Sequence, residues 1–520
     1  MVVPRSARFV PAQSGTGAFL LRRPAPGAAN RSSFEESAKK MAKQKQEKFV
    51  SEITPRDTDF AQWYTDVIKK TDLVDYAPVR GCMVMKPYGY AIWELIQKEL
   101  DARFKATGHQ NVYLPMLIPE SLLLKEADHV EGFAPEVAWV TMGGGEQLTE
   151  RLAVRPTSET LFCTMYSKWV QSWRDLPMKY NQWCSVMRWE KTTRPFLRTA
   201  EFLWQEGHTI HATAEESEQE TMQMLEVYRE FAENVGAIPV ICGRKSEKEK
   251  FAGARATYSI EAMMHDGKAL QAGTSHNVGT NVSVPFDIKY LSKEGKQEYE
   301  HETSWGVSTR LIGALIMVHG DDRGLKLPPR LAPIQVVILP IASHKPGVSE
   351  KSEEIRASLA SAGLRVELDD RDASAGWKFN EWEMKGVPVR LEVGPRDIEN
   401  GVVTYVRRDT LEKATLPIDG LADALKALLD DVQANMLTQA RAFMTEHTTI
   451  AHTLDELVAG ANGGFALASW CGETECEEHL KAEHAITTRN MPFDQSDLPT
   501  ETCPICGKPA KCKIYFAKAY

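Results

Sequence analysis

Apolar residues recur with two different spacings in the part of the chain that precedes residue 333. Helical spacing predicts amphipathic helices over residues 58–71 and 90–104, and a third over 213–235, which opens with a Thr-x-x-Glu capping box. A short strand is expected over 112–114. Residues 182–208 predict an antiparallel hairpin, because two segments rich in β-branched and aromatic residues flank a Thr-Thr-Arg-Pro turn. This part of the chain is therefore expected to combine helices with antiparallel strands.

The pattern changes at about residue 333, after a Leu-Pro-Pro sequence. Segments that predict strands now alternate with segments that predict helices: strands over 334–341, 365–368, 387–393 and 402–406, and helices over 349–362 and around Trp377 and Trp382. This alternation is typical of βαβ units on a small, mostly parallel sheet. We therefore expect a leader over 1–47 and three domains, over 48–332, 333–440 and 441–520.

Length and charge limit the possible functions. A chain of 520 residues is long enough for about three domains, each with its own core. The net charge of −9 provides no global basic field, so any RNA must be bound through local patches. The sequence contains no run of about eighteen apolar residues, so it predicts no membrane span.

The first 34 residues stand apart, because they contain five arginines and no acidic residue. This composition fits a transit peptide, which would place the protein in an organelle. It also fits an extended reading frame ahead of a true start at Met41, which would leave the protein in the cytoplasm. We favour the second interpretation and expect the leader to be disordered.

The predicted hairpin carries many polar side chains on one face. Arg188 and Glu190 are two residues apart, so both are expected on one face of the first strand, and Arg198 follows the loop. Alternate positions of the second strand are Phe202, Trp204, Glu206 and His208. A core does not bury so many charges without pairing them, so this face is expected to line a cleft. Guanidinium groups and an aromatic ring suit a nucleoside triphosphate, and the alternative is a solvated hairpin whose charges neutralise one another.

Four cysteines near the end of the sequence form two close pairs. Cys471 and Cys476 are followed by Cys503 and Cys506, and this spacing suits a tetrahedral structural zinc ion. Disulfides are the alternative, but the five other scattered cysteines favour a reducing compartment.

Three shorter segments can be interpreted from their residues alone. Gly143–Gly145 is expected at a hairpin tip, and the charged run Lys245–Lys250 in a solvated loop. Thr157 and Glu159 are typical of a helix start, with Thr157 as the cap and Glu159 in the first turn. The spacing of His208 and His211 resembles that of two metal ligands, but no third ligand is evident nearby.

The order Arg-x-Glu, loop, Arg-x-x-Glu-Phe between Arg188 and Phe202 closely resembles motif 2 of the class II aminoacyl-tRNA synthetases. The continuation Leu-Trp-Gln-Glu-Gly-His narrows the resemblance to the prolyl-tRNA synthetase family. The chain end Ile-Tyr-Phe-Ala-Lys-Ala-Tyr resembles that of the archaeal and eukaryotic type of this family. The long helix, strand and Pro115 resemble motif 1, and Ser304–Arg310 before an apolar helix resembles motif 3. The resemblance extends over about residues 50–520.

The resemblance implies a six-stranded antiparallel catalytic sheet flanked by helices, an α/β anticodon-binding domain and a small C-terminal α/β domain with structural Zn²⁺. It implies an enzyme that uses ATP with Mg²⁺ to activate L-proline as prolyl-adenylate and transfers it to the 3′ end of tRNA(Pro). Homodimerisation is carried by the resemblance alone. An apolar pocket discriminates by only about 1–3 kcal/mol per methylene, so misactivation of alanine and cysteine is expected. Glu201 and Ser304 are only about a hundred positions apart, so no cis-editing domain is expected.

The resemblance also assigns roles to particular side chains. Arg188 and Arg310 are expected to be catalytic. The ATP site is expected to contain Arg188, Glu190, Arg198, Thr199, Phe202, Gln271, Thr274 and Arg310. The proline site is expected to contain Thr157, Glu159, Arg188, Trp204, Glu206, His208, His276, Ser304 and Gly306. Candidates for contacts with anticodon bases are Arg371, Trp377, Lys378 and Lys385. The terminal Tyr520 is expected to be directed towards the active site.

Two other classes of function remain open from the sequence. One is a synthetase-like ligase that adenylates an amino acid but charges a carrier protein or a metabolite. The other is a non-catalytic regulator that kept the fold. The anticodon-like domain argues against the first, and the three arginines of the predicted ATP site argue against the second.

Overall fold

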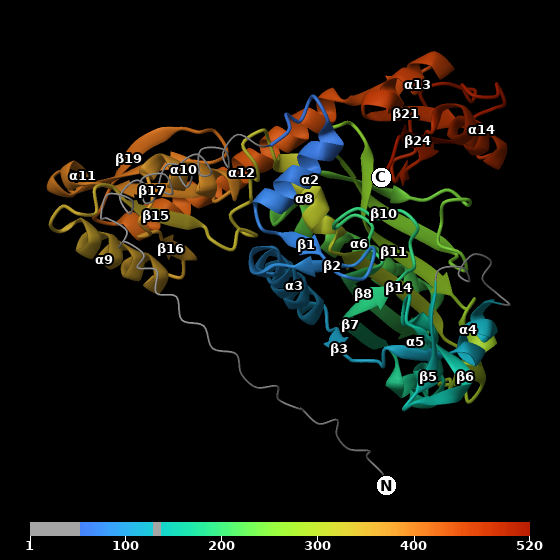
Figure 1. The fold of residues 1–520 in the computed structure, drawn as a ribbon. Coiled ribbons are helices and arrows are strands. Elements are labelled where there is room, and N and C mark those ends of the chain that lie inside the picture. Colours follow the sequence, from blue (N-terminus) through green and yellow to red (C-terminus); the bar gives the residue numbers. More distant parts are fainter. Residues whose placement is uncertain (1–52, 128–136) are drawn as a thin grey trace, which may run out of the picture. The chain divides into compact units, whose positions relative to one another are not determined.

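The computed structural model describes residues 53–127 and 137–520, so the predicted leader over 1–47 lies outside the described residues. The largest sheet has eight strands in the order β23-β9-β10-β11-β14-β8-β7-β3. Figure 1 labels its strands from β10 to β3. Their bounds are β3 Gln110–Asn111, β7 Met178–Met187, β8 Glu201–His211, β9 Val240–Arg244, β10 Ala256–Met263, β11 Ala269–Gly279, β14 His301–Ser308 and β23 Met491–Pro492. All neighbours are antiparallel except β3 and β7. The antiparallel strands from β9 to β7 are the six expected, and β3 and β23 extend them at the two edges.

The hairpin forms as predicted, with one difference at its first strand. Phe202 pairs with Val186 and His208 with Tyr180, so alternate residues of β8 share one face. However, β7 ends at Met187. Arg188 and Glu190 therefore lie beyond the strand, and the prediction that both stand on its face was wrong.

The opposite face of this sheet is covered by helices α3 Pro87–Ala106, α6 Ala214–Asn234 and α8 Arg310–His319. Helix α2 Phe60–Lys70 packs into the same hydrophobic core. Trp305 of β14 packs against Phe104 of α3 and Tyr228 of α6, with ring centroids 5.0 and 6.4 Å apart. A Cβ atom at Gly207 would lie 2.2 Å from the Trp305 ring, so only glycine fits beneath it. Burial of these rings fixes the sheet against its helices and leaves the other face for the site.

One short element differs from its prediction. The strand expected over 112–114 is replaced by the two-residue β3, which lies just before it. Only Val112 continues the pairing beyond the end of β3, because its amide donates to the Asn181 carbonyl. The glycines at the predicted tip join β5 Ala138–Gly143 to β6 Glu146–Val154, in a sheet with β4 Leu117–Pro119. The remaining elements of this region are β1 Val74–Tyr76, β2 Met83–Met85, β12 Lys289–Leu291, β13 Gln297–Tyr299, α4 Glu120–Ala127, α5 Glu159–Trp169, α7 Ser283–Phe286 and the 3-10 helix η1 Trp173–Asp175.

A second sheet follows, in the order β16-β15-β17-β18-β19. Its strands are β15 Val336–Pro340, β16 Val366–Leu368, β17 Val389–Val393, β18 Val402–Arg407 and β19 Lys413–Pro417, with helices α9 Val348–Ser361, α10 Ala375–Met384 and α11 Pro395–Glu399. Strands β16, β15 and β17 are parallel, whereas β18 and β19 are added antiparallel. The expected mostly parallel sheet is therefore mixed, because β17, β18 and β19 follow one another without a long crossover helix.

The long helix α12 Leu421–Glu446 runs across the predicted boundary at residue 440 and leads to a third sheet, ordered β20-β21-β24-β22. Its strands and helices are β20 Thr448–Ala451, β21 Phe465–Trp470, β22 Thr487–Thr488, β24 Cys512–Ala517, α13 Leu454–Gly463 and α14 Thr474–His484. Strand β23 leaves this region and pairs with β9 of the large sheet. In the described ranges, no helix is both long and apolar enough to cross a membrane.

Candidate active site

The exposed face of the large sheet contains a cavity of about 410 Å³. Predicted site residues that line it are Thr157, Glu159, Arg188, Phe202, Trp204, Glu206, His208, Gln271, Thr274, His276, Ser304, Gly306 and Arg310. They come from the start of α5, the loop after β7, strands β8, β11 and β14, and the start of α8. The cavity therefore brings together every residue expected in the proline site and most of those expected at ATP.

Arg188 enters this cavity from the loop after β7. Its Nε donates to the Pro156 carbonyl at 3.1 Å, and its guanidinium lies 5.6 and 5.4 Å from the ring centroids of Phe202 and Trp204. These contacts hold the planar guanidinium at the edge of the cavity, where it can form a bidentate contact with an oxyanion.

Arg310 lies at the first position of α8. Its guanidinium donates to the carbonyls of Leu197 and Gln271 at 3.2 and 3.4 Å, and among the described residues no carboxylate forms an ion pair with it. Burial, together with the like charges of Arg198 and Arg188, lowers the pKa of Arg310 to about 10. Binding of an anion between these guanidiniums would relieve their repulsion.

Three predicted ATP residues lie outside the main cavity. Arg198 lines a neighbouring cavity of about 210 Å³ that also contains Arg310 and Tyr520. Glu190 lies 3.8 Å from the Arg198 guanidinium, and Thr199 lines a third cavity of about 280 Å³. Arg310 thus borders two cavities and connects Arg198 to the main one.

Glu206 is the most strongly held carboxylate of the site. Its Oε2 accepts from the Thr157 hydroxyl at 3.1 Å and the Ser158 amide at 2.9 Å, and its Oε1 accepts from Gln182 Nε2 at 3.0 Å. Burial alone would raise the pKa of Glu206, but contacts with His208 and Ser158 lower it to about 2. Ser158, not Thr157, is at the N-cap position of α5, so the prediction that Thr157 caps the helix was wrong.

His208 lies between two carboxylates, one of which the sequence did not indicate. Its Nε2 is 3.7 Å from Glu206 and its Nδ1 is 3.1 Å from Glu302, while the ring stacks on Phe162 with centroids 4.5 Å apart. Burial alone would lower the pKa of His208, but the two carboxylates raise it to about 10. The imidazole is therefore a buried cation at neutral pH.

The charged run Lys245–Lys250 forms a loop as predicted, but the start of this loop is buried rather than solvated. Lys245 is buried, and its Nζ lies 2.7 Å from the buried Glu261. Glu249 and Phe251 line the main cavity, and the Phe251 ring lies 4.9 Å from the His276 ring. Pairing with Glu261, 16 positions away on β10, makes this burial possible, and the charge run itself gave no signal of that partner.

His276, beside Phe251 in the cavity lining, is held in a neutral state. Burial, together with the charge of His208, lowers its pKa to about 3. Its Nδ1 lies 2.9 Å from the Thr257 hydroxyl, which also accepts from the Phe251 amide at 2.9 Å. Thr257 and Ser308 also line the cavity and were not predicted.

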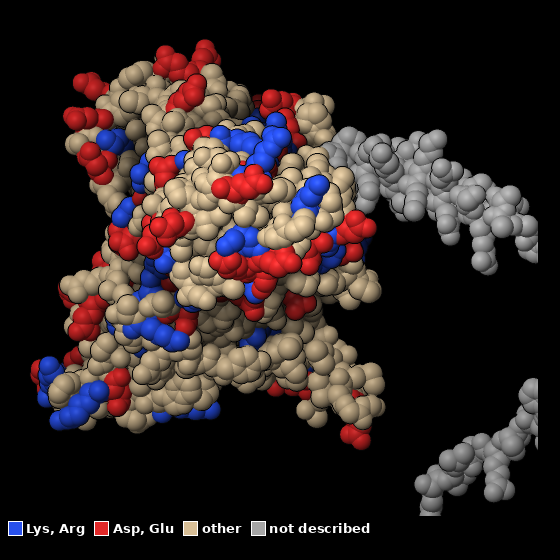
Figure 2. All heavy atoms as spheres, turned by 90° about the vertical axis from the view of Figure 1, so that its left-hand side faces the viewer, with Lys and Arg blue, Asp and Glu red and all other residues tan. Residues whose placement is uncertain are grey.

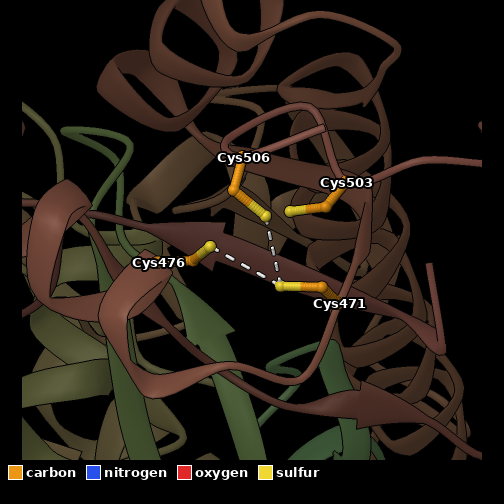
Figure 3. Close-up of side chains that lie close together, drawn as sticks. All are labelled: Cys471, Cys476, Cys503 and Cys506. Atoms are coloured by element: carbon orange, nitrogen blue, oxygen red, sulfur yellow. Dashed lines mark hydrogen bonds between the residues drawn. The ribbon is translucent and has the colours of Figure 1, made fainter. Parts of the chain in front are cut away.

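The four predicted zinc ligands converge from three segments of the C-terminal region (Figure 3). The sulfur of Cys471 lies 3.5 Å from that of Cys476 and 3.6 Å from that of Cys506, and all four Sγ atoms lie within 4.8 Å of one another. Tetrahedral Zn–S bonds of about 2.3 Å place sulfurs about 3.8 Å apart, so the spacing fits such an ion. In the part of the chain that the structure describes, only these four residues form a candidate metal group, so His208 and His211 do not.

The candidate anticodon contacts are mostly engaged within the protein. Arg371 pairs with Asp369 and Glu381, and its guanidinium lies 5.1 Å from the Trp377 ring. Lys385 pairs with Glu381 at 3.1 Å. Lys378 is only 6% exposed, and its Nζ donates to the Asp369 carbonyl, so it does not present a free cation to RNA.

Acidic and basic side chains are interspersed on the face that carries this second sheet, and Figure 2 shows no continuous basic area among its described residues. Anticodon recognition on this face would therefore rest on individual contacts.

Comparison with known proteins identifies the family. Residues 139–319 match the tRNA synthetase class II core domain (G, H, P, S and T), 335–428 match an anticodon binding domain, and 454–520 match the C-terminal domain of prolyl-tRNA synthetase. Proline–tRNA ligase from Alkaliphilus oremlandii is 64% identical over 479 residues, which cover 92% of this chain and 99% of that protein. The chain belongs to the proline–tRNA ligase family.

Other members of this family show similar agreement. Proline–tRNA ligase of Clostridium novyi is 64% identical over 478 residues, covering 92% of this chain and all of that protein. Proline–tRNA ligase 2 of Bacillus cereus is 60% identical over 473 residues, covering 91% of this chain and 99% of that protein. The class II core matched by the family model contains the main cavity, with Thr157 near one limit and Arg310 near the other.

Proposed function

We propose that the main cavity activates L-proline with ATP and that the resulting prolyl group is transferred to the 3′ end of tRNA(Pro). The observation that carries this proposal is the convergence of Arg188 and Arg310 on one cavity that also contains the carboxylates of Glu159 and Glu206. Phosphates and a substrate carboxylate require cations, whereas the secondary amine of proline requires an anionic acceptor. The cavity offers both kinds of group.

The chemistry needs no side-chain nucleophile. The proline carboxylate attacks the α-phosphorus of ATP, the bond to the β-phosphate oxygen breaks, and pyrophosphate leaves. Arg188 is placed to hold the carboxylate and the α-phosphate together, while Arg310 and Arg198 hold the distal phosphates. Rate enhancement then comes from positioning and charge stabilisation, as is typical of phosphoryl chemistry. Mg²⁺ bound to the ATP phosphates would neutralise part of their charge, and Glu190 beside Arg198 is the carboxylate we assign to that side of the nucleotide.

The remaining roles are those that the family resemblance implies. We assign Phe202 to stacking on adenine, and Thr199, Gln271 and Thr274 to contacts with the nucleotide. We assign the proline ring and amine to a pocket of Thr157, Glu159, Trp204, Glu206, His208, His276, Ser304 and Gly306. A depressed pKa keeps Glu206 ionised at neutral pH, which suits an acceptor for the ammonium group.

The decisive experiment is exchange of labelled pyrophosphate into ATP by the full chain, followed by aminoacylation of a tRNA(Pro) transcript. We expect exchange that depends on proline, and charging that weakens when the anticodon is changed. Exchange without tRNA charging would instead support a ligase for a carrier protein or metabolite. A complete lack of exchange would support a regulator that kept the fold.

We also propose that the C-terminal cysteines hold one structural Zn²⁺. Cys471, Cys476, Cys503 and Cys506 supply four thiolates, which is the usual donor set of a closed structural site. Such an ion would tie the end of β21 and the start of α14 to the turn containing Cys503 and Cys506. We propose domain limits of 48–332, 333–440 and 441–520, with α12 continuing from the second domain into the third and the metal in the third.

Homodimerisation is a further part of the proposal. Tyr113 and Met116, which follow α3 and β3, are 73% and 48% exposed, and Tyr90 on α3 and Leu117 on β4 are also exposed. Apolar side chains gathered near one helix are typical of a subunit interface. Sedimentation of the full chain should give twice the monomer mass, and substitution of both Tyr113 and Met116 by glutamate should give the monomer mass.

We propose finally that the chain has no editing domain between motifs 2 and 3. The segment from residue 212 to 300 consists of α6, strands β9 to β13, and α7, most of which belong to the catalytic sheet or cover it. Errors in amino-acid choice would then persist unless another protein corrected them.

A further inference from the structure

Residues 246–251 form a wall of the main cavity. Glu249 and Phe251 line the cavity, and Phe251 packs against His276, which we assign to the proline pocket. The position of this short segment therefore decides the shape of the pocket at its His276 side.

A hydroxyl group holds the turn at the start of this wall. Ser246 Oγ accepts a hydrogen bond from the Glu249 amide at 3.2 Å and donates one to Glu477 Oε2 at 3.1 Å. The same carboxylate oxygen accepts from the Thr488 hydroxyl at 2.8 Å. Ser246, Glu477 and Thr488 are all buried, so water does not replace these bonds.

Glu477 belongs to the C-terminal region and lies 231 positions from Ser246. It follows Cys476 directly on α14, so one member of the cysteine cluster shown in Figure 3 and this carboxylate belong to the same helical turn. A second buried interaction joins the same two regions, because Glu261 pairs with both Lys245 and Arg489 at 2.7 Å. The cysteine cluster and the cavity wall are thus connected through one glutamate and one serine.

We propose that Glu477 is a positioning residue for the amino-acid pocket: it fixes Ser246, and through Ser246 the wall formed by Glu249 and Phe251. Glu477 does not line the cavity, so it touches no substrate and acts only through the wall. This inference rests on the proposed function, because the pocket it shapes is the one we assign to proline. It makes the C-terminal region part of substrate selection.

Substitutions can distinguish a hydrogen-bonding role of the Glu477 side chain from a role in filling space. Replacement of Glu477 by alanine leaves the hydroxyls of Ser246 and Thr488 without their acceptor, and the wall loses its anchor. Glutamine retains a carbonyl oxygen that can accept both bonds. Glu475 provides a matched control, because it is also one residue from Cys476 on α14 but is exposed.

The test compares Glu477→Ala, Glu477→Gln and Glu475→Ala in the full chain by pyrophosphate exchange. Loss of a hydrogen bond to a charged acceptor predicts that Glu477→Ala raises the KM for proline about tenfold and leaves the KM for ATP within about twofold. Glu477→Gln should recover most of the loss, and Glu475→Ala should behave as the unmodified chain. Hydrogen exchange should show faster exchange of the 246–251 amides in Glu477→Ala alone. Equal increases in both KM values, or unchanged exchange of these amides, would overturn the proposal.

A second variant covers the case in which Glu477→Ala does not fold. Ser246→Ala removes the same bridge from the other side and should give the same rise in the KM for proline. Where both single variants fold, the double variant should be no worse than either one, because both remove one interaction. Additive losses would contradict the proposal. If the unmodified chain itself shows no exchange dependent on proline, it is the proposed function that fails, whereas active unmodified protein with unaffected variants rejects only the role of Glu477.

Discussion

His208 Nδ1 lies 3.1 Å from Glu302 Oε1, and this contact places a buried imidazolium behind the carboxylate of Glu206. Glu302 itself does not line the cavity. It therefore supports the proposed proline site from behind, because together with Glu206 it raises the pKa of His208.

This arrangement predicts a specific dependence of stability on pH. The folded-state pKa of His208, about 10, lies above its ordinary 6.5, so its pairing stabilises the fold fully below about pH 6.5 and is lost as pH rises towards 10. Glu302→Gln should therefore lower the free energy of unfolding most near pH 6.5 and least near pH 10. Urea denaturation at several pH values measures this difference. Glu294→Gln, on an exposed turn, should show no such trend.

Arg188→Ala should reduce pyrophosphate exchange at least about a hundredfold, which is the typical loss when one group that stabilises developing charge is removed. The loss should appear mainly in kcat, because Arg188 is assigned to the reacting carboxylate and α-phosphate. Arg174→Ala, which removes a cation stacked on Trp173 outside the cavity, should leave the rate unchanged. A rate near that of the unmodified protein would refute the assignment of Arg188.

Cys503→Ser should remove most of the bound zinc and lower the melting temperature of the C-terminal region. Three thiolates cannot complete the tetrahedral set, and structural zinc sites contribute folding energy directly. Elemental analysis of the purified variants measures the metal. Cys512→Ser is the control, because the Cys512 sulfur donates to the Trp470 carbonyl at 3.9 Å and is not part of the four-cysteine group, so one zinc ion per chain should remain.

Alanine should be activated and should remain attached to tRNA(Pro). Each missing methylene reduces kcat/KM by only about 10- to 200-fold, so the pocket cannot exclude alanine at high concentration. Incubation of purified Ala-tRNA(Pro) with the full chain should give hydrolysis no faster than in buffer. Rapid deacylation by the protein alone would show that an editing site exists.

The sequence predicted those features that depend on local spacing. Alternation along β8 placed Phe202, Trp204, Glu206 and His208 on one face, and the structure confirms that they share the cavity. Helix α6 begins after Thr213, whose hydroxyl accepts from the Glu216 amide as the capping pattern predicted. Both features follow from backbone geometry over a few residues.

The features that were missed depend on partners far along the chain. Lys245 is buried because its Nζ pairs with the Glu261 carboxylate, which also pairs with Arg489, and no sequence window around Lys245 contains Arg489. Glu302 supports His208 across two neighbouring strands, and only the register of β14 against β8 brings them together. Pairing of this kind is decided by the tertiary fold, so a linear pattern does not reveal it.

Strand β23 has a consequence for the order in which the protein can be completed during translation. It pairs with β9, and the Asn490 side chain beside it reaches back 249 positions to the Ile241 carbonyl. While the ribosome is still making the intervening residues, the backbone of β9 faces solvent with one row of its groups unpaired. A nascent chain in this state offers an open template for wrong pairing, so slow or stalled synthesis before residue 492 should be the stage at which aggregation competes most strongly with folding.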